Sequence, residues 1–463
     1  MALPTPKTSR QVALDVLNKF HVARHNAGEI LHSMIHQTDQ KAQATDLVFG
    51  VIRNRPAIDM LITRMADAPL KRIRKKLLNI LRIGVYELVF APKTAQYAVV
   101  NEAVNLAGAV ARKKQAGFVN AVLRNLSRSI VDRTISLADA DVLKTLPQSP
   151  QTGCRFNIEI LPDPKADPAA YLSNAFSLPK WLIDDWLSKF GFEQTRQICF
   201  AGNRAPSIFI QPNTLKISAK SLAEGFTVRR IEFDIDPTGK VLKLKSHTPV
   251  HELPGFEEGL FTVQDPASAQ AVDILAPQPG WTIIDLCAAP GAKTIRMAQL
   301  MDNVGRIIAT DIDHERLKKV NENCIRCGIT IVRIVPYDRL EEVVPKLGRC
   351  DAVLLDVPCS NTGVLARRPE VRLRIKPQAV GRLSRTQLRL LEKAAQMIST
   401  GSRICYSTCS ILNQENKEVI KHFLLSNPDF CLESENLILP RIADDTSFDH
   451  DGGYVAILVK NPA

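Results

Sequence analysis

The chain has 463 residues, more than one hydrophobic core usually organises, so the sequence predicts two or three domains. Hydrophobic residues make up 45% and charged residues 23%, the composition of a soluble globular protein. No apolar run approaches the roughly 20 residues that a membrane span needs, and the opening MALPTPKTSR lacks a signal-peptide core. We therefore expect a cytoplasmic protein with no membrane partner.

The net charge of +12 is concentrated at one end of the chain. Residues 1–130 hold 20 Lys and Arg against 8 Asp and Glu, whereas the rest of the chain holds 40 of each. The basic residues are densest in LKRIRKKLLNILR (70–82) and ARKKQ (111–115). Phosphate backbones are the commonest partner of such a surface, although a solvated helical face is the alternative.

The first part of the chain has the spacing of helices. Apolar residues recur at three and four positions, as in RQVALDVLNKF (10–20), which predicts a helical domain over 1–130. Prolines and polar residues then cluster in 131–168, which we interpret as a linker with one isolated strand in CRFNIEIL (154–161). Helical spacing resumes at PKWLIDDW (179–186).

A small α/β module is expected over 169–265. After the helical segment, β-branched and aromatic runs separated by turns predict strands at SIFIQPNTL (207–215), FTVRRIEF (226–233), VLKLKS (241–246) and LFTVQD (260–265).

From 266 to 463 strands alternate regularly with helices. Helices are expected from 292 and at 313–327, 378–399 and 413–425. This alternation predicts a doubly wound, mainly parallel α/β sheet whose last segments pair as an antiparallel edge. The strands are expected at 281–286, 306–312, 329–335, 351–356, 402–408 and 454–460.

The first motif of this sheet is IIDLCAAPGAKT (283–294). A strand ends at Asp285, and small residues make a compact turn before a helix, so backbone amides can approach a ligand. The turn is not G-x-G-x-x-G, so a dinucleotide is not indicated. Asp311 ends the next strand, where a carboxylate can bind ribose hydroxyls. Together they predict a nucleoside-bearing cofactor, although either alone could be a tight turn or a helix cap.

The second motif is a pair of thiols that follow strands. VLLDVPCSNTGV (353–364) places Asp356 and Cys359 at a strand end, with Pro358 fixing the turn between them. ICYSTCSI (404–411) places Cys409 at the end of another strand. Two such thiols and a carboxylate beside a nucleoside cofactor predict chemistry rather than packing. Cys405 lies deeper in its strand and is interpreted as core.

The remaining cysteines carry weaker signals. Cys324 and Cys327 form one C-x-x-C, which is either a zinc pair or two thiols on a helix surface; a second ligand pair is missing, so no metal is proposed. Cys287 follows a strand directly and is interpreted as a structural member of the cofactor turn. The ten cysteines of this long chain do not resemble a disulfide framework.

At these motifs the sequence resembles the RNA cytosine-C5 methyltransferases. The whole chain looks like the bacterial small-subunit ribosomal RNA branch, the RsmB or Sun type, because residues 1–128 also resemble the NusB-like RNA-binding domain fused there. The resemblance implies an all-α NusB-like domain, a small α/β RNA-binding module and a Rossmann-like class I methyltransferase domain. The matching segments are QDPASAQAVDIL (264–275), DLCAAPGAKT (285–294), ATDID (309–313), DVPCSNTGVLARRPEVR (356–372) and YSTCSILNQENKEVI (406–420).

The resemblance also implies roles for individual residues. Asp311 should bind the ribose of S-adenosylmethionine, Asp338 of VPYDR should lie near its adenine, and Asp356 should lie near its methionine end and the target base. Cys409 should be the nucleophile, and Cys359 should assist release of the product. The turn that should bind this cofactor consists of Cys287, Ala288, Ala289, Pro290, Gly291, Ala292 and Lys293.

The activity so implied is methylation of carbon 5 of a specific cytosine in 16S ribosomal RNA through a Cys409–C6 adduct. We expect a monomer that acts on naked or partly assembled ribosomal RNA. The alternatives are an enzyme of the same chemistry acting on another RNA such as tRNA, a noncatalytic RNA-binding assembly factor, and a methyltransferase acting on protein or a small molecule. The fold alone does not decide among them.

Several positions depart from the usual motifs of these methyltransferases. Ala292 replaces the second glycine of C-A-A-P-G-G-K-T, Val357 replaces the alanine of D-A-P-C, and Asn361 stands where a small residue is usual before T-G. Leu373 marks the end of a segment that lacks the usual tryptophan. The run ARRPEVR (366–372) is either a solvated charge run or an RNA contact.

Overall fold

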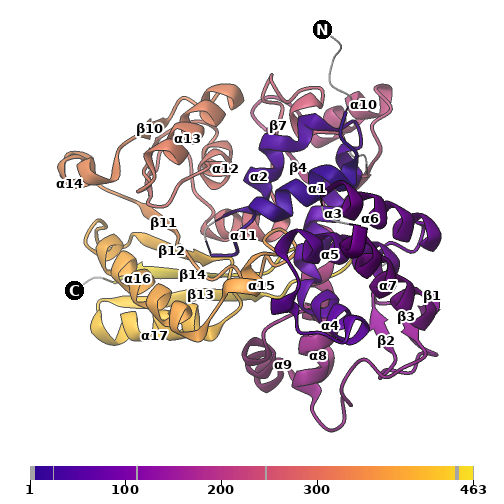
Figure 1. Ribbon diagram of the computed structural model, residues 1–463. Helices are drawn as coiled ribbons and strands as arrows, with labels where there is room; N and C mark the ends of the chain where they lie inside the picture. The colour runs from indigo at the N-terminus through magenta and orange to yellow at the C-terminus, as the bar shows by residue number, and fades with distance from the viewer. Residues whose placement is uncertain (1–5, 24, 111–112, 246–247, 444–447, 462–463) are drawn as a thin grey trace. The chain divides into compact units, whose positions relative to one another are not determined.

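The computed structural model describes residues 6–23, 25–110, 113–245, 248–443 and 448–461 (Figure 1). The chain divides into two compact units. The helical unit contains the residues up to Arg204 together with Leu365–Ile375, and the sheet unit contains Ala205–Val364 and the residues from Lys376 onward. Across the described ranges, none of the helices combines the length and apolar character that crossing a bilayer requires.

The helical unit is built around α5 (Lys75–Phe90), in which every residue from Leu77 to Val89 is buried. A helix that is buried on all sides forms the centre of a bundle. The helices packed around it are α1 (Ser9–Lys19), α3 (Lys41–Arg53), α4 (Arg55–Ala66), α6 (Gln96–Val110) and α7 (Lys113–Ser129), while α2 (Ala27–Met34) packs on α1 and α3. The predicted helical domain is confirmed.

The same unit continues through a small sheet and two further helices. An antiparallel sheet in the order β1-β3-β2 is formed by β1 (Ile130–Ser136), β2 (Thr145–Pro147) and β3 (Thr152–Phe156). Ordered strands therefore lie within the segment interpreted as a linker. They are followed by α8 (Pro168–Phe176) and α9 (Lys180–Asn203), and by contacts both helices belong to the helical unit. The boundaries at 130, 168 and 265 stay predictions.

The small module of the sheet unit has four antiparallel strands in the order β5-β6-β4-β7. They are β4 (Phe209–Pro212), β5 (Phe233–Ile235), β6 (Leu242–Leu244) and β7 (Phe261–Val263). The strand expected at 226–233 is wrong for all but its last residue, because residues 226–228 end the helix α10 (Ala219–Val228) and β5 begins only at Phe233. Leu222, Ala223 and Phe226 are buried at helical spacing, and Ser218 caps the helix, so packing overrides the β-branched composition.

The larger sheet has seven strands in the order β10-β9-β8-β11-β12-β14-β13. The five strands on the β10 side run parallel, and β14 is antiparallel to both of its neighbours. The strands are β8 (Thr282–Asp285), β9 (Arg306–Ala309), β10 (Val332–Ile334), β11 (Ala352–Asp356), β12 (Arg403–Thr408), β13 (Phe430–Ile438) and β14 (Gly453–Lys460).

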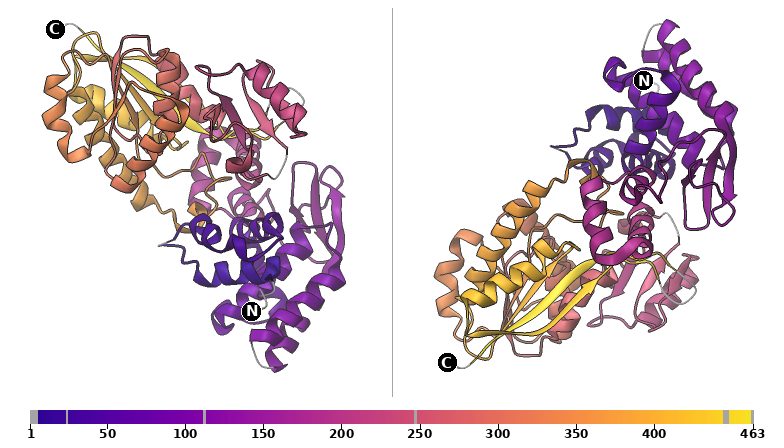
Figure 2. Two further views of the ribbon diagram at one scale, coloured as in Figure 1. Left: turned by 90° about the horizontal axis from the view of Figure 1, so that it is seen from above. Right: turned by 90° about the horizontal axis from the view of Figure 1, so that it is seen from below.

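Helices cover both faces of this sheet, as Figure 2 shows. One face packs against α11 (Pro266–Leu275), α12 (Ala292–Leu300) and α13 (His314–Cys327), and the other against α14 (Leu340–Val343), α16 (Pro377–Ala395) and α17 (Lys417–Ser426). The predicted doubly wound, Rossmann-like fold is confirmed. Chain order reverses between β8 and β11, and ligands of such sheets bind beyond the carboxyl ends of the strands at that point.

One strand was not predicted. β13 forms the edge of the sheet next to β14, and its central residues, with the sequence CLESEN, are exposed. A strand that is held by backbone hydrogen bonds and carries charged side chains at a sheet edge has no buried alternating face to reveal it in the sequence.

Candidate active site

The first part of the site is the turn after β8. Asp285 ends this strand in a buried position, and its Oδ2 accepts a 2.7 Å hydrogen bond from Thr294 Oγ1 of α12. Burial raises the pKa of Asp285 to about 7. Gly291 precedes α12 with φ 105°, and a Cβ atom there would lie 3.2 Å from Val320 Cα of α13. The glycine therefore lets the start of α12 approach α13 closely.

Lys293 joins this turn to the end of β11. Its Nζ donates to Asp356 Oδ2 at 2.7 Å and to Ser268 Oγ at 3.2 Å. Burial alone would lower the pKa of Lys293. The Asp356 carboxylate and, to a smaller extent, Cys409 raise it, and the net result is a raised pKa. The Lys293 side chain is 12% exposed and that of Asp356 is 36% exposed, so the carboxylate faces the open side of the pair.

Two further carboxylates follow the neighbouring strands. Asp311 comes after β9 and is buried; its Oδ2 accepts from Ala289 N at 3.1 Å and its Oδ1 from Asp313 N at 3.0 Å. Asp338 lies in a short 3-10 helix after β10 and is exposed. Each of the four adjacent strands β10, β9, β8 and β11 is thus followed or ended by an aspartate.

This donor and acceptor set fits a nucleoside that carries an amino-acid group. The carboxylates of Asp311 and Asp338 can accept from ribose hydroxyls and an exocyclic amine, and the exposed side of Asp356 can accept from an ammonium group. The N-terminus of α12, nine residues long, favours a carboxylate through its free N–H groups and its dipole.

The second part of the site is the pair of thiols. β11 and β12 run parallel with Asp356 opposite Ser407, so the residues after both strands emerge at the same edge of the sheet. The sulfur atoms of Cys359 and Cys409 are 3.1 Å apart. The hydrogen bond with Cys409, and then burial, raise the pKa of Cys359 well above that of a free thiol. Cys359 therefore carries its proton at neutral pH.

Asn361 contacts both thiol segments. Its Nδ2 donates to the Cys359 carbonyl at 2.9 Å, and its Oδ1 accepts from Cys409 Sγ at 3.1 Å. The backbone has φ 62°, in the left-handed region that asparagine tolerates better than most residues. The departure noted at this position thus lies directly against the candidate nucleophile.

The sequence did not reveal two buried side chains that hold both thiol segments. The Glu415 carboxylate accepts from Ser360 N at 2.8 Å and from Gln387 Nε2 at 3.1 Å, and also from the Ser360 hydroxyl. Asn416 accepts from Thr408 Oγ1 at 2.7 Å and donates to the Ser410 carbonyl at 2.9 Å. Their only sequence signal is an acid and an amide side by side, a few residues after Cys409.

The structure therefore brings four predicted residues into one cluster: Lys293 bonds to Asp356, and Cys359 contacts Cys409. Asp311 contacts the cofactor turn through Ala289, whereas Asp338 stands at the same sheet edge without a direct contact to the thiols among the described residues.

The other cysteines that the sequence singled out are buried or half-buried. Cys405 is fully buried, and its Sγ donates to the Ala271 carbonyl at 3.4 Å. Cys287 is half-buried, and burial raises its pKa. The interpretation of Cys324 and Cys327 as surface thiols is wrong, because both face the core from α13. Within the described ranges, no three His, Cys, Asp or Glu side chains gather as a metal site would require.

From the sequence, the run 366–372 is interpreted as either a solvated charge run or an RNA contact. Both interpretations are wrong for its last residue, because Arg372 is buried in the helical unit. Its guanidinium donates to the carbonyls of Arg53 at 2.9 Å, Phe176 at 3.2 Å and Gly202 at 2.7 Å, and to the side-chain oxygen of Asn203. Burial, and then the charge of Arg53, lower the pKa of Arg372 to about 9. Arg372 therefore binds the protein itself.

Sequence models of three protein families match this chain. The NusB family matches residues 7–128, the RsmF/B-like ferredoxin-like domain matches residues 178–251, and the 16S rRNA methyltransferase RsmB/F family matches residues 272–447. The last match covers the cofactor turn and both thiol segments.

Solved structures share the fold. The crystal structure of PH0851 superposes with a TM-score of 0.73 at 24% identity, over 98% of this chain and 99% of that one. A methyltransferase homolog protein from Pyrococcus horikoshii gives a TM-score of 0.54 at 26% identity, over 64% of this chain and 99% of that one.

Curated relatives match over most of their length. The probable ribosomal RNA small subunit methyltransferase B of Bacillus subtilis is 29% identical over 92% of this chain and 90% of its own. The protein of that name from Synechocystis is 32% identical over 84% of this chain and 82% of its own. Ribosomal RNA small subunit methyltransferase B of Escherichia coli K12 is 30% identical over 84% of this chain and 83% of its own. The chain is an enzyme that belongs to the 16S rRNA methyltransferase RsmB/F family.

Proposed function

We propose that this enzyme transfers a methyl group from S-adenosylmethionine to carbon 5 of a cytosine in 16S ribosomal RNA, through a covalent bond between Cys409 and carbon 6. The observation that carries the proposal is the meeting of the Cys409 and Cys359 sulfurs at 3.1 Å, at the sheet edge where Lys293 and Asp356 form their ion pair. The small-subunit ribosomal RNA named for the curated relatives supports the substrate class.

S-adenosylmethionine supplies the methyl group, which its sulfonium makes electrophilic. In this chain Asp311 and Asp338 would hold its nucleoside, Asp356 would face its methionine end, and the backbone of residues 287–293 would line the space between. The acidic strand ends and the free N–H groups of α12 support this arrangement.

The thiolate of Cys409 makes the ring reactive. Carbon 5 of cytosine is too weakly nucleophilic to accept a methyl group directly, so the Cys409 sulfur first bonds to carbon 6 and shifts an electron pair toward carbon 5 and N3. The Asp356 carboxylate accepts hydrogen bonds from a protonated N3 and from the N4 amino group, and the 2.7 Å hydrogen bond from Lys293 holds that carboxylate in place. Uridine lacks the amino group and is expected to be a poor substrate.

Cys359 completes the reaction. After the transfer, carbon 5 carries both the new methyl group and its original proton. When a base removes that proton, the electron pair restores the C5–C6 double bond, and the C6–S bond breaks to return Cys409 as a thiolate. The base is a water oriented by Cys359, which keeps its own proton and lies directly against the Cys409 sulfur, and this water passes the carbon-5 proton to solvent.

The first test replaces each thiol. Cys409→Ser is expected to abolish the incorporation of labelled methyl groups into small-subunit ribosomal RNA, because an alcohol is not ionised at neutral pH. Cys359→Ala is expected to transfer the methyl group but to leave a covalent protein–RNA adduct on a denaturing gel. Cys431→Ser, at an exposed cysteine of β13, is the control and should be fully active.

Retained methylation by Cys409→Ser would contradict the covalent mechanism, and free turnover by Cys359→Ala would contradict the role of Cys359. Bisulfite sequencing of RNA from cells with and without the gene would locate the modified cytosine. A site in tRNA would change the substrate while leaving the thiol chemistry in place.

A further inference from the structure

The helical unit carries a groove of about 990 Å³ between α6 and α7. On α7 the lining residues Lys113, Gly117, Asn120 and Arg124 recur at intervals of three and four, so they lie on one face of the helix. On α6 the lining residues include Tyr97. Nothing in the proposed chemistry uses this groove.

Small residues keep the α7 side of the groove open. Ala116 and Gly117 both line it, and a Cβ atom built on Gly117 would meet no other atom within 4 Å. Glycine inside a helix costs about 1 kcal/mol relative to alanine, so its presence here is not explained by helix stability. The missing side chain leaves room for a ligand.

Tyr97 presents an aromatic ring to solvent at one end of the groove. Its side chain is 81% exposed, and among the described large hydrophobic residues it is the one exposed aromatic. A hydrogen bond from Ser127 to Gln96 places the start of α6 beside the end of α7, so the ring lies at the same end as Arg124 and Arg128. An exposed aromatic ring beside cations is typical of surfaces on which bases stack.

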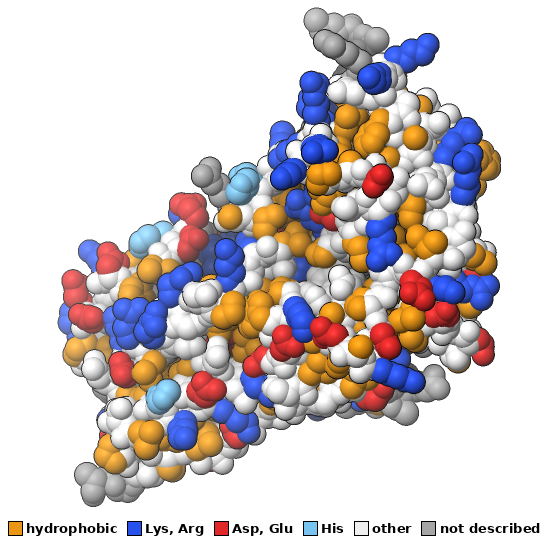
Figure 3. Space-filling view, turned by 60° about the horizontal axis from the view of Figure 1, so that its bottom comes forward, with side chains coloured by type: hydrophobic (Ala, Val, Ile, Leu, Met, Phe, Trp, Pro, Cys, Tyr) orange, Lys and Arg blue, Asp and Glu red, His pale blue; other side chains and the backbone are white. Residues whose placement is uncertain are grey.

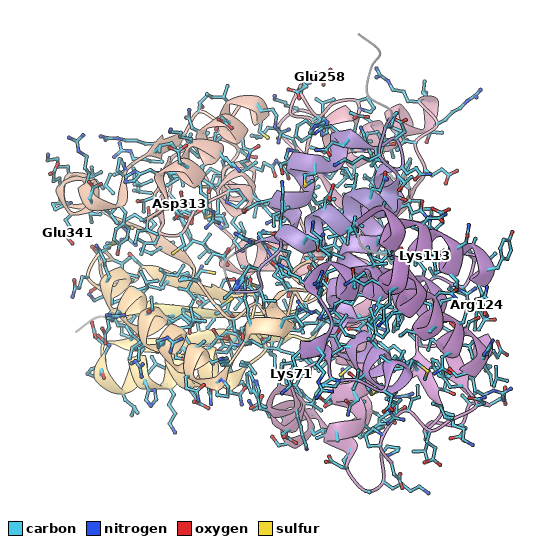
Figure 4. The ribbon with its side chains drawn as sticks, in the orientation of Figure 1. Lys71, Lys113, Arg124, Glu258, Asp313 and Glu341 are labelled. Atoms are coloured by element: carbon cyan, nitrogen blue, oxygen red, sulfur yellow. The ribbon has the colours of Figure 1, made fainter. Side chains whose placement is uncertain are left out.

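The charge of the groove favours an anionic ligand. Its lining contains Lys113, Arg124 and Arg128 and no Asp or Glu. Lys113 and Arg124 are labelled on the helical unit in Figure 4, and Figure 3 shows groups of basic side chains on the face of the molecule that it draws. A phosphate backbone with unpaired bases offers both the negative charge and the ring faces that these residues fit.

We infer that the α6–α7 groove binds a single-stranded segment of the substrate RNA, with a base stacked on Tyr97 and phosphates against Lys113, Arg124 and Arg128. The inference rests on the proposed function, which makes RNA the substrate. A duplex would not fit as well, because its bases are stacked on one another and cannot lie on the tyrosine ring.

The test fills the groove without disturbing the fold. Gly117→Leu places a side chain in open space and raises helix propensity, so the variant should be at least as stable as the parent protein. Ala109→Leu, at an exposed position of α6 outside the groove lining, is the matched control. The probe is a fluorescein-labelled, unstructured RNA of about 12 nucleotides, a length within the site sizes of single-strand binders, and the measurement is its Kd with the full chain.

Gly117→Leu is expected to raise the Kd about tenfold or more, since its side chain fills the groove between Lys113 and Arg124, whereas Ala109→Leu should leave the Kd unchanged. Tyr97→Ala should weaken binding by a similar factor, and Tyr97→Phe should not, because stacking needs only the ring. Arg124→Ala should reduce the salt slope of binding by about one. An unchanged Kd for Gly117→Leu would overturn the inference.

The outcome can be separated from that of the proposed function. If the parent protein methylates ribosomal RNA while Gly117→Leu binds the probe normally, the groove is not an RNA site and the chemistry stands. If no RNA is methylated by the parent protein, the proposed function fails whatever the groove binds.

Discussion

Asn361, one of the departures from the usual motif, contacts both candidate thiol segments. The hydrogen bond from Nδ2 to the Cys359 carbonyl turns the amide so that Oδ1 faces Cys409. An amide oxygen accepts a hydrogen bond from a thiol S–H, so this 3.1 Å contact engages the sulfur of Cys409 in the resting site. The residue would then restrain Cys409 until the substrate displaces this contact.

We expect Asn361→Gly to increase the rate at which iodoacetamide alkylates Cys409, because the acceptor is removed and glycine keeps the φ of 62° without strain. Asn361→Asp should decrease that rate, since a carboxylate beside the sulfur disfavours a second negative charge. The measurement is the alkylation rate against pH, read by mass spectrometry of the Cys409 peptide. Equal rates in all three proteins would show that the contact has no effect on reactivity.

For individual residues, the sequence predicted where the side chains lie better than it predicted their hydrogen-bond partners. Asp356, Cys359 and Cys409 follow strands that parallel pairing brings to one edge, so their gathering could be expected. The hydrogen bonds of Glu415 and Asn416 could not be predicted, because they depend on how the segment after Cys409 folds back over both thiol turns.

Among the elements, the segment Leu365–Ile375 has the most unusual packing. Its Arg372 donates to carbonyls at or next to the carboxyl ends of three helices: α3, which ends at Arg53, α8, which ends at Phe176, and α9, which ends at Asn203. Helix carboxyl ends have unpaired carbonyls and a partial negative charge, so a guanidinium suits them. These contacts offset the burial of a charge that has no ion-pair partner among the contacts just described.

Arg372→Met is expected to destabilise the helical unit by about 3 kcal/mol, since it leaves several buried carbonyls without their charged donor. Arg372→Lys should recover only part of this loss, because an ammonium cannot reproduce the planar fork of donors. The measurement is urea unfolding of the full chain, with hydrogen exchange in α8 and α9 to locate the change. Arg374→Met, at an exposed neighbour, is the control and should behave like the parent protein.

Helical spacing predicted the long elements of both units, such as α7, α9 and α16, because a buried face repeats every three or four residues. The packing of residues 365–375 in the helical unit could not be predicted in this way. The charged residues of this segment indicate an exposed run in the sequence. Arg372 is an interior residue only because it contacts residues far away in the chain.

On the scale of the whole molecule, the excess positive charge is more exposed than the composition alone indicates. Several acidic side chains of the first 130 residues are engaged within the helical unit: Asp59 pairs with Arg82, Glu87 with Arg10, and Asp46 accepts from the hydroxyl of Tyr86. Lys113 and Arg124 are among the cations left exposed, whereas Arg53 is buried.

We therefore expect RNA affinity to fall steeply with salt, by at least tenfold between about 50 and 200 mM, because each phosphate contact releases counterions. Binding of S-adenosylmethionine should change little over the same range, since it releases no counterions from a phosphate backbone. Fluorescence anisotropy for RNA and calorimetry for the cofactor measure the two dependences. A flat salt dependence for RNA would contradict a phosphate-binding role for the basic surface.

The placement of Arg372 also constrains how this protein can be made. A ribosome synthesises residues 6–204 long before residue 372, so during most of translation the carboxyl ends of three helices lack the side chain that joins them. The first-made unit can reach its final stability only after most of the catalytic sequence has been added. Nascent chains released before about residue 375 should be digested by protease faster in α8 and α9 than the finished protein.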